Sequence, residues 1–254
     1  MLIYKIIVLF INNNKRIEEM DYRDHEAGVT KEHYCVRGRC DLLNTILSKI
    51  ATGKKRLKIL NLGVGTGNDL EILNRYGDNY VVDIDTNALK MIKKFYTEKK
   101  LADACNLPYK SNFFDVVVSF DVFEHIEHHQ KAMDEAYRVL KKGGNLVFSV
   151  PAFQSLFSAR DKAMGHYRRY RKKQLRTCME KFSRVKLNYW NCSVFPIIAP
   201  LRIIQKNNPP QMGDPKISRT AHNFLYALIR IEDWAIKHSI PLPFGITLVG
   251  VCTK

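Results

Sequence analysis

A glycine-rich turn is the feature of this sequence best suited to holding a ligand. Residues 57–62 form a mostly apolar run, and Gly63, Gly65 and Gly67 follow before a helical pattern opens near Asn68. Glycine has no Cβ atom, so the backbone can turn sharply and approach a ligand closely. A phosphate-binding loop would need Lys-Ser or Lys-Thr after the last glycine, and a dinucleotide loop would need glycine at position 68. The turn therefore predicts a nucleotide-like ligand of another kind.

Two aspartates are expected at the same edge as the glycine turn. Asp83 closes the next apolar run, immediately before Ile84, and an ionised carboxylate there can accept hydrogen bonds from both hydroxyls of a ribose. Asp85 fits better as the N-cap of the following helix. Asp103 follows a third extended segment and can accept from an adenine amino group, with a loop cap as its alternative role.

Strands alternating with helices must position these residues. Strand patterns and helical patterns alternate from residue 33 to about residue 150, which predicts βαβ units and a parallel sheet. The predicted helices are 33–50, 68–76, 88–99 and 128–142, and the predicted strands are 57–62, 80–84, 114–120 and 145–150, with a short extended piece at 102–105. Further along, strands are expected at 185–194 and 246–253 and an amphipathic helix at 218–238.

Four motifs in order resemble the class I S-adenosylmethionine-dependent methyltransferases. They are LNLGVGTG, VVDID, ADACNLPYKSNFFDVVVSFDVFEHI and VLKKGGNLVFSVP. The resemblance implies an α/β fold: a doubly wound, seven-stranded, mostly parallel sheet with a helical cap inserted before the last strand. It divides the chain into an N-terminal extension (1–32), a methyltransferase domain (33–194 plus 246–254) and a cap insertion (195–245).

The resemblance also implies roles for individual residues toward the cofactor S-adenosylmethionine. The glycines would wrap its methionine and ribose part, and Asp83 with Ile84 would bind the ribose side. The other implied contacts are Asn61, Asp103, Ala104, Phe120 and Asp121. Asn61 departs from the family, which usually has an acidic residue at that position. An amide still accepts a hydrogen bond but lacks the charge.

Methyl transfer to an oxygen acceptor needs a general base. His125 is the first candidate and His166 the second, while a helix-capping role is the alternative for His125. Glu124 is interpreted as structural, and His128 and His129 as solvated. No metal site is predicted, because the cysteines and histidines lack zinc-site spacing.

A basic segment is expected to contact the acceptor. Tyr167, Arg168, Arg169 and Tyr170 form a Gly-His-x-Arg-Arg-Tyr motif after Ser158-x-x-Asp161, and paired arginines suit a bidentate grip on phosphate or carboxylate. A solvated helix start is the alternative. The motif looks like a methyltransferase subgroup that acts on small or lipid-linked molecules.

Composition limits the partners without deciding the fold. The 254 residues carry a net charge of +16 and are 46% hydrophobic, which excludes wholesale disorder and favours anionic partners. We therefore expect transfer to a small or lipid-linked, anionic acceptor. The alternatives are an RNA methyltransferase and a non-catalytic, membrane-associated binding protein.

Location and membrane contact are expectations of a similar kind. Six scattered cysteines without a CxxC pair predict reduced thiols in a cytoplasmic protein. Residues 1–11 are too short to span a bilayer, and they are read as a short strand, an amphipathic anchor or an extension ahead of a start at Met20. Residues 195–206 could contact a membrane surface from the inner side, with packing on the core as the alternative.

Overall fold

The computed structural model describes residues 33–53, 55–206, 208 and 218–254. The predicted extension over 1–32, the interpretations of residues 1–11 and Met20, and part of the predicted insertion (209–217) lie outside the described residues.

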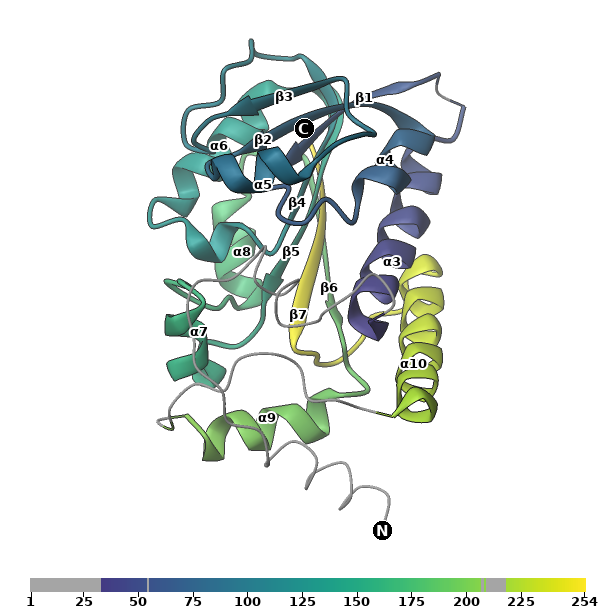
Figure 1. Cartoon of the computed structure of the whole chain (residues 1–254), viewed down its shortest axis with the longest axis vertical. Helices are drawn as coiled ribbons and strands as arrows, with labels where there is room; N and C mark the ends of the chain where they lie inside the picture. Colours follow the sequence, from purple (N-terminus) through teal and green to yellow (C-terminus); the bar gives the residue numbers. More distant parts are fainter. Residues whose placement is uncertain (1–32, 54, 207, 209–217) are drawn as a thin grey trace.

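One seven-stranded sheet forms the centre of the molecule (Figure 1). The strand order is β3-β2-β1-β4-β5-β7-β6, with β1 to β5 parallel and β7 antiparallel to both of its neighbours. This is the predicted fold class, which is thereby confirmed. The strands are β1 (Leu57–Leu62), β2 (Gly77–Asp83), β3 (Glu98–Leu101), β4 (Phe114–Phe120), β5 (Leu140–Pro151), β6 (Arg184–Trp190) and β7 (Thr247–Thr253).

Helices cover both faces of the sheet and bury two apolar cores. One core lies under α3 (Tyr34–Ile50), α4 (Leu70–Tyr76), α5 (Thr86–Met91) and α10 (Arg219–Lys237). The other lies under α6 (His129–Val139) and α8 (Lys172–Cys178). Burying apolar side chains on both faces explains why the central strands are continuous apolar runs rather than alternating ones. Both faces being covered leaves the strand ends as the exposed edges of the sheet.

Short helices gather where the parallel strands end. The 3-10 turn η1 (Phe123–His125) follows β4, while η2 (Gln154–Leu156) and α7 (Ala159–Ala163) follow β5. Helix α9 (Phe195–Ile204) follows β6, and Thr247 of β7 pairs with the last residues of both β5 and β6. Helix α9 therefore starts at the same sheet edge as η1 and α7 (Figure 1).

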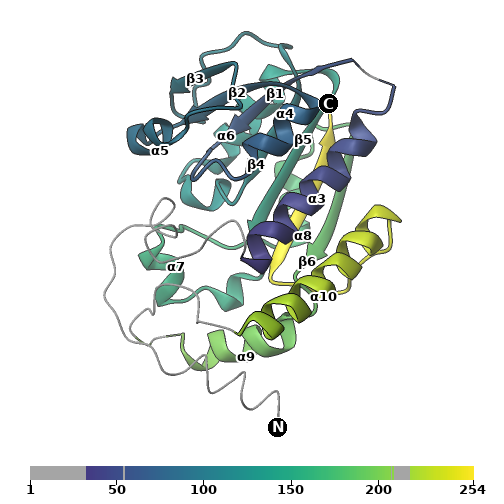
Figure 2. The same ribbon diagram turned by 45° about the vertical axis from the view of Figure 1, so that its right-hand side comes forward.

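The predicted insertion divides between two places. Helix α10 runs beside α3 in both views and closes one face of the sheet (Figure 2). The approach is close, because a Cβ atom on Gly38 would lie 2.5 Å from Cγ2 of Ile229. Helix α9 instead lies at the carboxyl edge. A cap over the acceptor thus stays a prediction for α9, whereas α10 packs on the core.

Several predicted boundaries were wrong: the strands predicted from residues 80 and 145 begin at Gly77 and Leu140, and the strand predicted to reach residue 194 ends at Trp190. Three further errors have a visible cause. The helix expected over 88–99 ends at Met91. Phe95 has a φ of +67°, a left-handed conformation that does not occur within a right-handed helix. Strand β3 lies at 98–101 instead of 102–105, and its Glu-Lys-Lys sequence suits an edge strand but carries no apolar signal. The helix expected to reach residue 142 ends at Val139, because β5 already begins at Leu140 and pairs with Phe114.

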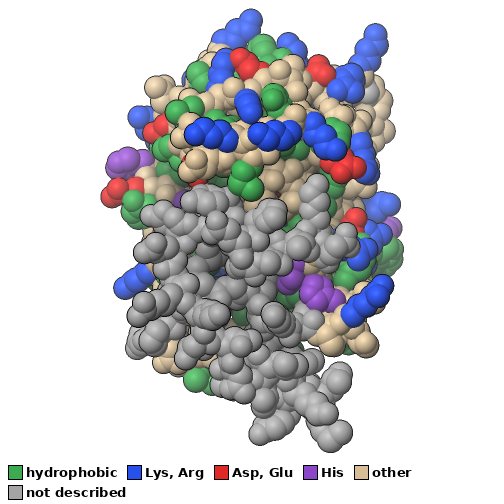
Figure 3. All heavy atoms as spheres, in the orientation of Figure 1, with side chains coloured by type: hydrophobic (Ala, Val, Ile, Leu, Met, Phe, Trp, Pro, Cys, Tyr) green, Lys and Arg blue, Asp and Glu red, His purple; other side chains and the backbone are tan. Residues whose placement is uncertain are grey.

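Charge is spread over the surface as well as concentrated in the basic segment. Blue Lys and Arg side chains recur over the part of the visible face that carries β3 and α5, with few acidic ones between them (Figure 3). Within the described part of the chain, none of the helices is both long enough and apolar enough to cross a bilayer.

Candidate functional site

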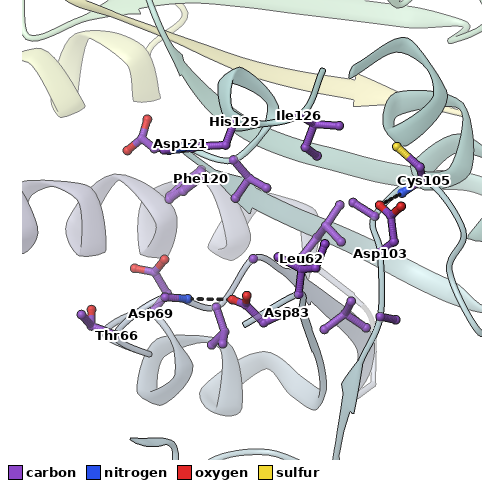
Figure 4. Close-up of a pocket in the computed structure, with 18 of the residues that line it drawn as sticks. Leu62, Thr66, Asp69, Asp83, Asp103, Cys105, Phe120, Asp121, His125 and Ile126 are labelled. Carbon is purple, nitrogen blue, oxygen red and sulfur yellow. Dashed lines mark hydrogen bonds between the residues drawn. The ribbon is translucent and has the colours of Figure 1, made fainter. Parts of the chain in front are cut away.

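A cavity of about 410 Å³ lies at the carboxyl ends of β1, β2 and β4 (Figure 4). The loop after β3 and the first turns of α3 complete its wall. Nine of the predicted site residues line it, from four different loops: Gly63, Gly65, Asp83, Ile84, Asp103, Ala104, Phe120, Asp121 and His125.

The glycine turn forms one wall and needs its glycines for two different reasons. Gly63, Gly65 and Gly67 have φ values of +75°, +49° and +72°, which other residues adopt only with strain. At Gly63 a Cβ atom would also lie 2.4 Å from Cγ2 of Val122, so β4's loop can pass close by. At Gly65 a Cβ atom would meet nothing within 4 Å, so the backbone there faces open space.

Asp83 is fixed against this turn by backbone donors. Its Oδ2 accepts from the Gly65 amide at 3.2 Å, and its Oδ1 accepts from the Asp85 amide at 2.9 Å. In Figure 4, the dashed line that ends on Asp83 marks the first of these bonds. A carboxylate held by two amides keeps its orientation while its remaining lone pairs can accept from a ligand.

Two predicted cofactor residues do not reach the cavity. Asn61 is 3% exposed in the middle of the sheet, in register with Val81 and Val118, and is not among the lining residues. The Gly67 amide donates to the Val64 carbonyl at 2.9 Å, so Gly67 closes the turn instead of lining the cavity. Asn61 is therefore enclosed within the sheet and Gly67 belongs to the turn outside the cavity lining, so neither lies where the predicted cofactor contact needs it.

The opposite wall combines an acid with exposed apolar surface. Asp103 Oδ1 accepts from the Cys105 amide at 2.8 Å, which aims the carboxylate along the wall next to Ala104 (Figure 4). Ile84 lines the cavity and is 75% exposed, an unusual environment for isoleucine. A flat apolar ligand group on Ile84 would remove that surface from water.

Sequence reasoning missed an arginine from α3. Arg39 lines the cavity, and its guanidinium lies 3.6 Å from both Asp69 Oδ1 and Asp121 Oδ2. Asp121 has a φ of +54° and accepts from Ser149 Oγ at 2.8 Å. The signal was available, since Arg39 lies three positions after Val36 and so shares its helix face.

Two histidines meet at the end of the cavity formed by η1. The rings of His125 and His166 make an edge-to-face contact with centroids 4.5 Å apart, although only His125 lines the cavity. Burial and the neighbouring His166 ring lower the pKa of His125 to about 4. His125 is therefore neutral at pH 7. His129, predicted to be solvated, is instead half-buried against Tyr170, and burial and Arg168 lower its pKa to about 4.

The basic segment docks onto η1 through backbone groups. The Arg168 guanidinium donates to the Ile126 and Glu127 carbonyls at 2.8 and 2.9 Å, and the Tyr167 amide donates to the Glu124 carbonyl at 2.8 Å. Two stretches more than 40 positions apart in the chain thus form one unit beside the cavity.

The predicted grip of this segment on an anion needs correction at two positions. Arg169 is 3% exposed and pairs with the buried Asp161 at 2.6 Å, so its charge is already neutralised. Tyr170 is fully buried and donates to the Phe123 carbonyl at 3.0 Å. The hydrophobic core and the buried ion pair enclose these two side chains. Tyr167, which is 53% exposed, remains open to a ligand, and Arg168 is half-buried with its guanidinium bound to the Ile126 and Glu127 carbonyls.

Comparison with known proteins places this architecture in a family. Residues 60–148, which contain the glycine turn, Asp83, Asp103 and β4, match the family described as methyltransferase domain. Over residues 60–148 the chain therefore carries a methyltransferase domain. The predicted family and fold are confirmed, and S-adenosylmethionine, the cofactor predicted for this family, is supported by the same match.

Relatives of the methyltransferase domain cover only part of the chain. This chain is 34% identical over 113 residues to the uncharacterized protein MJ0638 of Methanocaldococcus jannaschii, and the match covers 44% of this chain and 48% of that one. It is 35% identical over 102 residues to the ubiquinone/menaquinone biosynthesis C-methyltransferase UbiE of Ruegeria, covering 35% and 40%. The matches thus span less than half the length of either relative.

Solved structures match the whole fold. A phosphoethanolamine N-methyltransferase 2 of Haemonchus contortus, in complex with S-adenosyl-L-methionine, superposes with a TM-score of 0.55 at 20% identity, covering 84% of this chain and 52% of that one. A SAM-dependent methyltransferase of Archaeoglobus fulgidus gives 0.53 at 16% identity, covering 85% and 94%. At these identities the likeness concerns the fold of the methyltransferase domain.

Proposed function

We propose that this protein binds S-adenosylmethionine in the cavity and transfers its methyl group to a small-molecule acceptor. One observation carries the proposal: the Gly65 amide and the Asp83 carboxylate, from the tips of two neighbouring strands, are joined at 3.2 Å and face the same cavity. An unobstructed main-chain bend beside a fixed carboxylate suits a nucleoside bearing a ribose diol.

The other walls fit the remaining parts of such a ligand. Asp103 and Ala104 would contact the adenine, and the exposed Ile84 would cover its flat face. Phe120 and Asp121 would lie near the methionine end. The bound cofactor supplies a methyl group that is already electrophilic, so the main tasks of the protein are to align the acceptor and to exclude water.

His125 is proposed as the residue that accepts the acceptor's proton, with His166 behind it. A neutral imidazole is required for this role, and the lowered pKa of His125 provides one at pH 7. We expect the acid limb of the pH–rate profile to lie nearer pH 4 than pH 6.5, because His125 is protonated only at the lower pH. An acid limb at pH 6.5 would exclude His125 as that base.

The acceptor is proposed to be anionic or lipid-linked, entering past Tyr167 and α9. The net charge of +16 favours an anion, and relatives include a methyltransferase named for ubiquinone/menaquinone biosynthesis. On α9, Ile203 and Ile204 are 59% and 76% exposed at the cavity's edge of the sheet. We propose that residues 195–206 touch a membrane surface when the acceptor is bound.

Calorimetry with S-adenosylmethionine and its demethylated product tests the central claim. Asp83→Asn should weaken binding of both by about 10–100-fold, because a charged acceptor of two hydrogen bonds is lost. Asp78→Asn is the matched control: it lies at the other end of β2, pairs with Arg56 on the surface and should bind normally. Equal affinity of the Asp83→Asn variant and the wild type would refute the site.

A further inference from the structure

Three potential metal ligands meet where η1 contacts the segment after α7. One ligand atom each from Glu124, His125 and His166 lies within 4.8 Å of the other two. Glu124 is 1% exposed and the His166 side chain 6% exposed, so these two are shielded from water, whereas His125 lines the cavity. The Tyr167 amide donates to the Glu124 carbonyl at 2.8 Å, which ties the two stretches of chain together at this point.

One ring nitrogen of His166 is fixed by a buried carboxylate. Its Nδ1 lies 3.2 Å from Oδ1 of Asp161, and that carboxylate is itself fixed by Arg169 at 2.6 Å and by the Ser158 amide and hydroxyl at 2.9 Å. Because an ionised carboxylate only accepts hydrogen bonds, a neutral His166 would present a protonated Nδ1 to Asp161 and keep Nε2 for a ligand. A carboxylate behind a ligating histidine is the usual second layer of a metal site.

We propose that Glu124, His125 and His166 bind one divalent transition-metal ion, best matched by Zn²⁺, with Asp161 as a positioning residue. Two imidazole nitrogens and one carboxylate oxygen form the donor set that zinc takes in sites with an open fourth position. Magnesium and calcium require oxygen ligands throughout, so this set disfavours them.

The distances leave a small adjustment for loading. Ligand atoms about 2.0–2.2 Å from a tetrahedral ion lie roughly 3.4 Å from one another. Atoms up to 4.8 Å apart would therefore approach by up to about 1.4 Å, within reach of side-chain rotation. His125 also lines the cavity, so the open position would lie beside it. There it could take an oxygen atom of the acceptor, a consequence that rests on the proposed function, whereas the metal site itself does not. A coordinated His125 has no lone pair for a proton, so its proposed role as a base belongs to the metal-free chain alone.

Titration of the metal-stripped full chain with Zn²⁺, in competition with a chromogenic chelator, tests the site. We expect one ion per chain, and for the Co²⁺-loaded chain an absorption band of a four- or five-coordinate ion. His166→Ala should weaken Zn²⁺ binding by at least about 100-fold and Asp161→Asn by about 10–100-fold. His238→Ala, on the exposed end of α10, is the control and should bind as the wild type does.

The wild-type protein alone can refute the proposal if a variant fails to fold. A Zn²⁺ dissociation constant weaker than about 10 μM, or no rise in melting temperature with Zn²⁺, would show that the cluster is a hydrogen-bonded histidine relay without a metal. Binding of the demethylated cofactor product by the metal-stripped chain separates the two proposals. If that binding persists and Zn²⁺ does not bind, only the metal site fails; if Zn²⁺ binds alone, only the methyl-transfer proposal fails.

Discussion

Two buried aspartates, Asp161 beside the candidate site and Asp233 on α10, are in opposite electrostatic states. Both are almost inaccessible to water, at 0% and 3% exposure. Burial alone raises the pKa of a carboxyl group, because it disfavours the charged form. The partners of each aspartate therefore decide whether it carries a charge.

Asp161 is surrounded by donors. Burial acts to raise its pKa, but the His166 hydrogen bond and the Arg169 and Arg202 guanidinium groups together lower the pKa of Asp161 well below its usual range. Asp233 has one neutral donor, Trp190 Nε1 at 3.0 Å, and burial raises its pKa to about 7. The difference shows that this chain maintains a buried charge at Asp161, beside the candidate site. On α10 it tolerates a buried carboxyl group, Asp233, whose pKa is about 7.

Replacing Asp161, the charged aspartate, should have the largest effect on the stability of the protein. Asp161→Asn leaves the Arg169 guanidinium buried without its counter-charge and turns an amide donor toward Ser158 or His166. We expect a loss of about 3–5 kcal/mol in the free energy of unfolding at pH 7, measured by urea denaturation.

Asp134→Asn is the control for that measurement. Asp134 and Lys181 form an exposed pair, 2.8 Å long, that solvent screens, so this substitution should change stability far less than Asp161→Asn does. If Asp161→Asn lost no more than this control, the buried ion pair would contribute nothing to the fold.

Replacing Asp233, whose pKa is raised by burial, should increase the free energy of unfolding at high pH. The pKa of Asp233 is higher in the folded state, about 7, than its unfolded value of 3.8, so the wild type loses stability as pH rises from about 4 through 7. An asparagine at this position would not titrate, while its side-chain oxygen would still accept from Trp190. We therefore expect Asp233→Asn to be more stable than the wild type by on the order of 2 kcal/mol at pH 8 and about equal at pH 4.

Paired denaturation curves at the two pH values check this result. A difference between wild type and Asp233→Asn that did not change with pH would mean that folding leaves the pKa of Asp233 unshifted. The comparison with Asp161 would then fail.

Removing Arg202, the weakest partner of Asp161, should have the smallest effect on stability. Arg202 on α9 lies 3.5 Å from Asp161 Oδ2 and is 20% exposed, farther away and more solvated than Arg169. We expect Arg202→Ala to lower the free energy of unfolding by about 1 kcal/mol or less.

A double-mutant cycle between Arg202 and Asp161 measures the same contact directly. The control is Arg230→Ala, which breaks a more exposed ion pair between Arg230 on α10 and Asp41 on α3. A coupling energy as large as the whole Asp161→Asn effect would make α9, and not Arg169, the main counter-charge.

Much of the fold could be predicted because apolar runs and turn residues are local signals. Strand β1 and helix α3 lie within one residue of their predicted bounds, since the buried face of each repeats in the sequence. Strand β3 could not be predicted with that accuracy. Its charged residues owe their conformation to pairing with β2, which is a long-range contact.

The candidate site was predictable in the part that follows strand ends. Gly65 and Asp83 meet because parallel neighbouring strands must end at one edge, a rule that needs no coordinates. Arg39 and the Glu124–His125–His166 cluster were missed as partners because helix packing and loop docking bring them together across the chain.

The sequence by itself therefore determined the layered α/β fold, the glycine turn and the carboxylate opposite it, because short-range patterns of burial and backbone freedom specify them. Only the tertiary structure decided which side chains of the basic segment remain free. Arg169 and Tyr170 were as plausible as Tyr167 in the sequence, but burial and hydrogen bonds set them inside the protein and left Tyr167 at the surface. Whether a side chain is satisfied within the fold depends on its neighbours in space, and these come from segments distant in the chain.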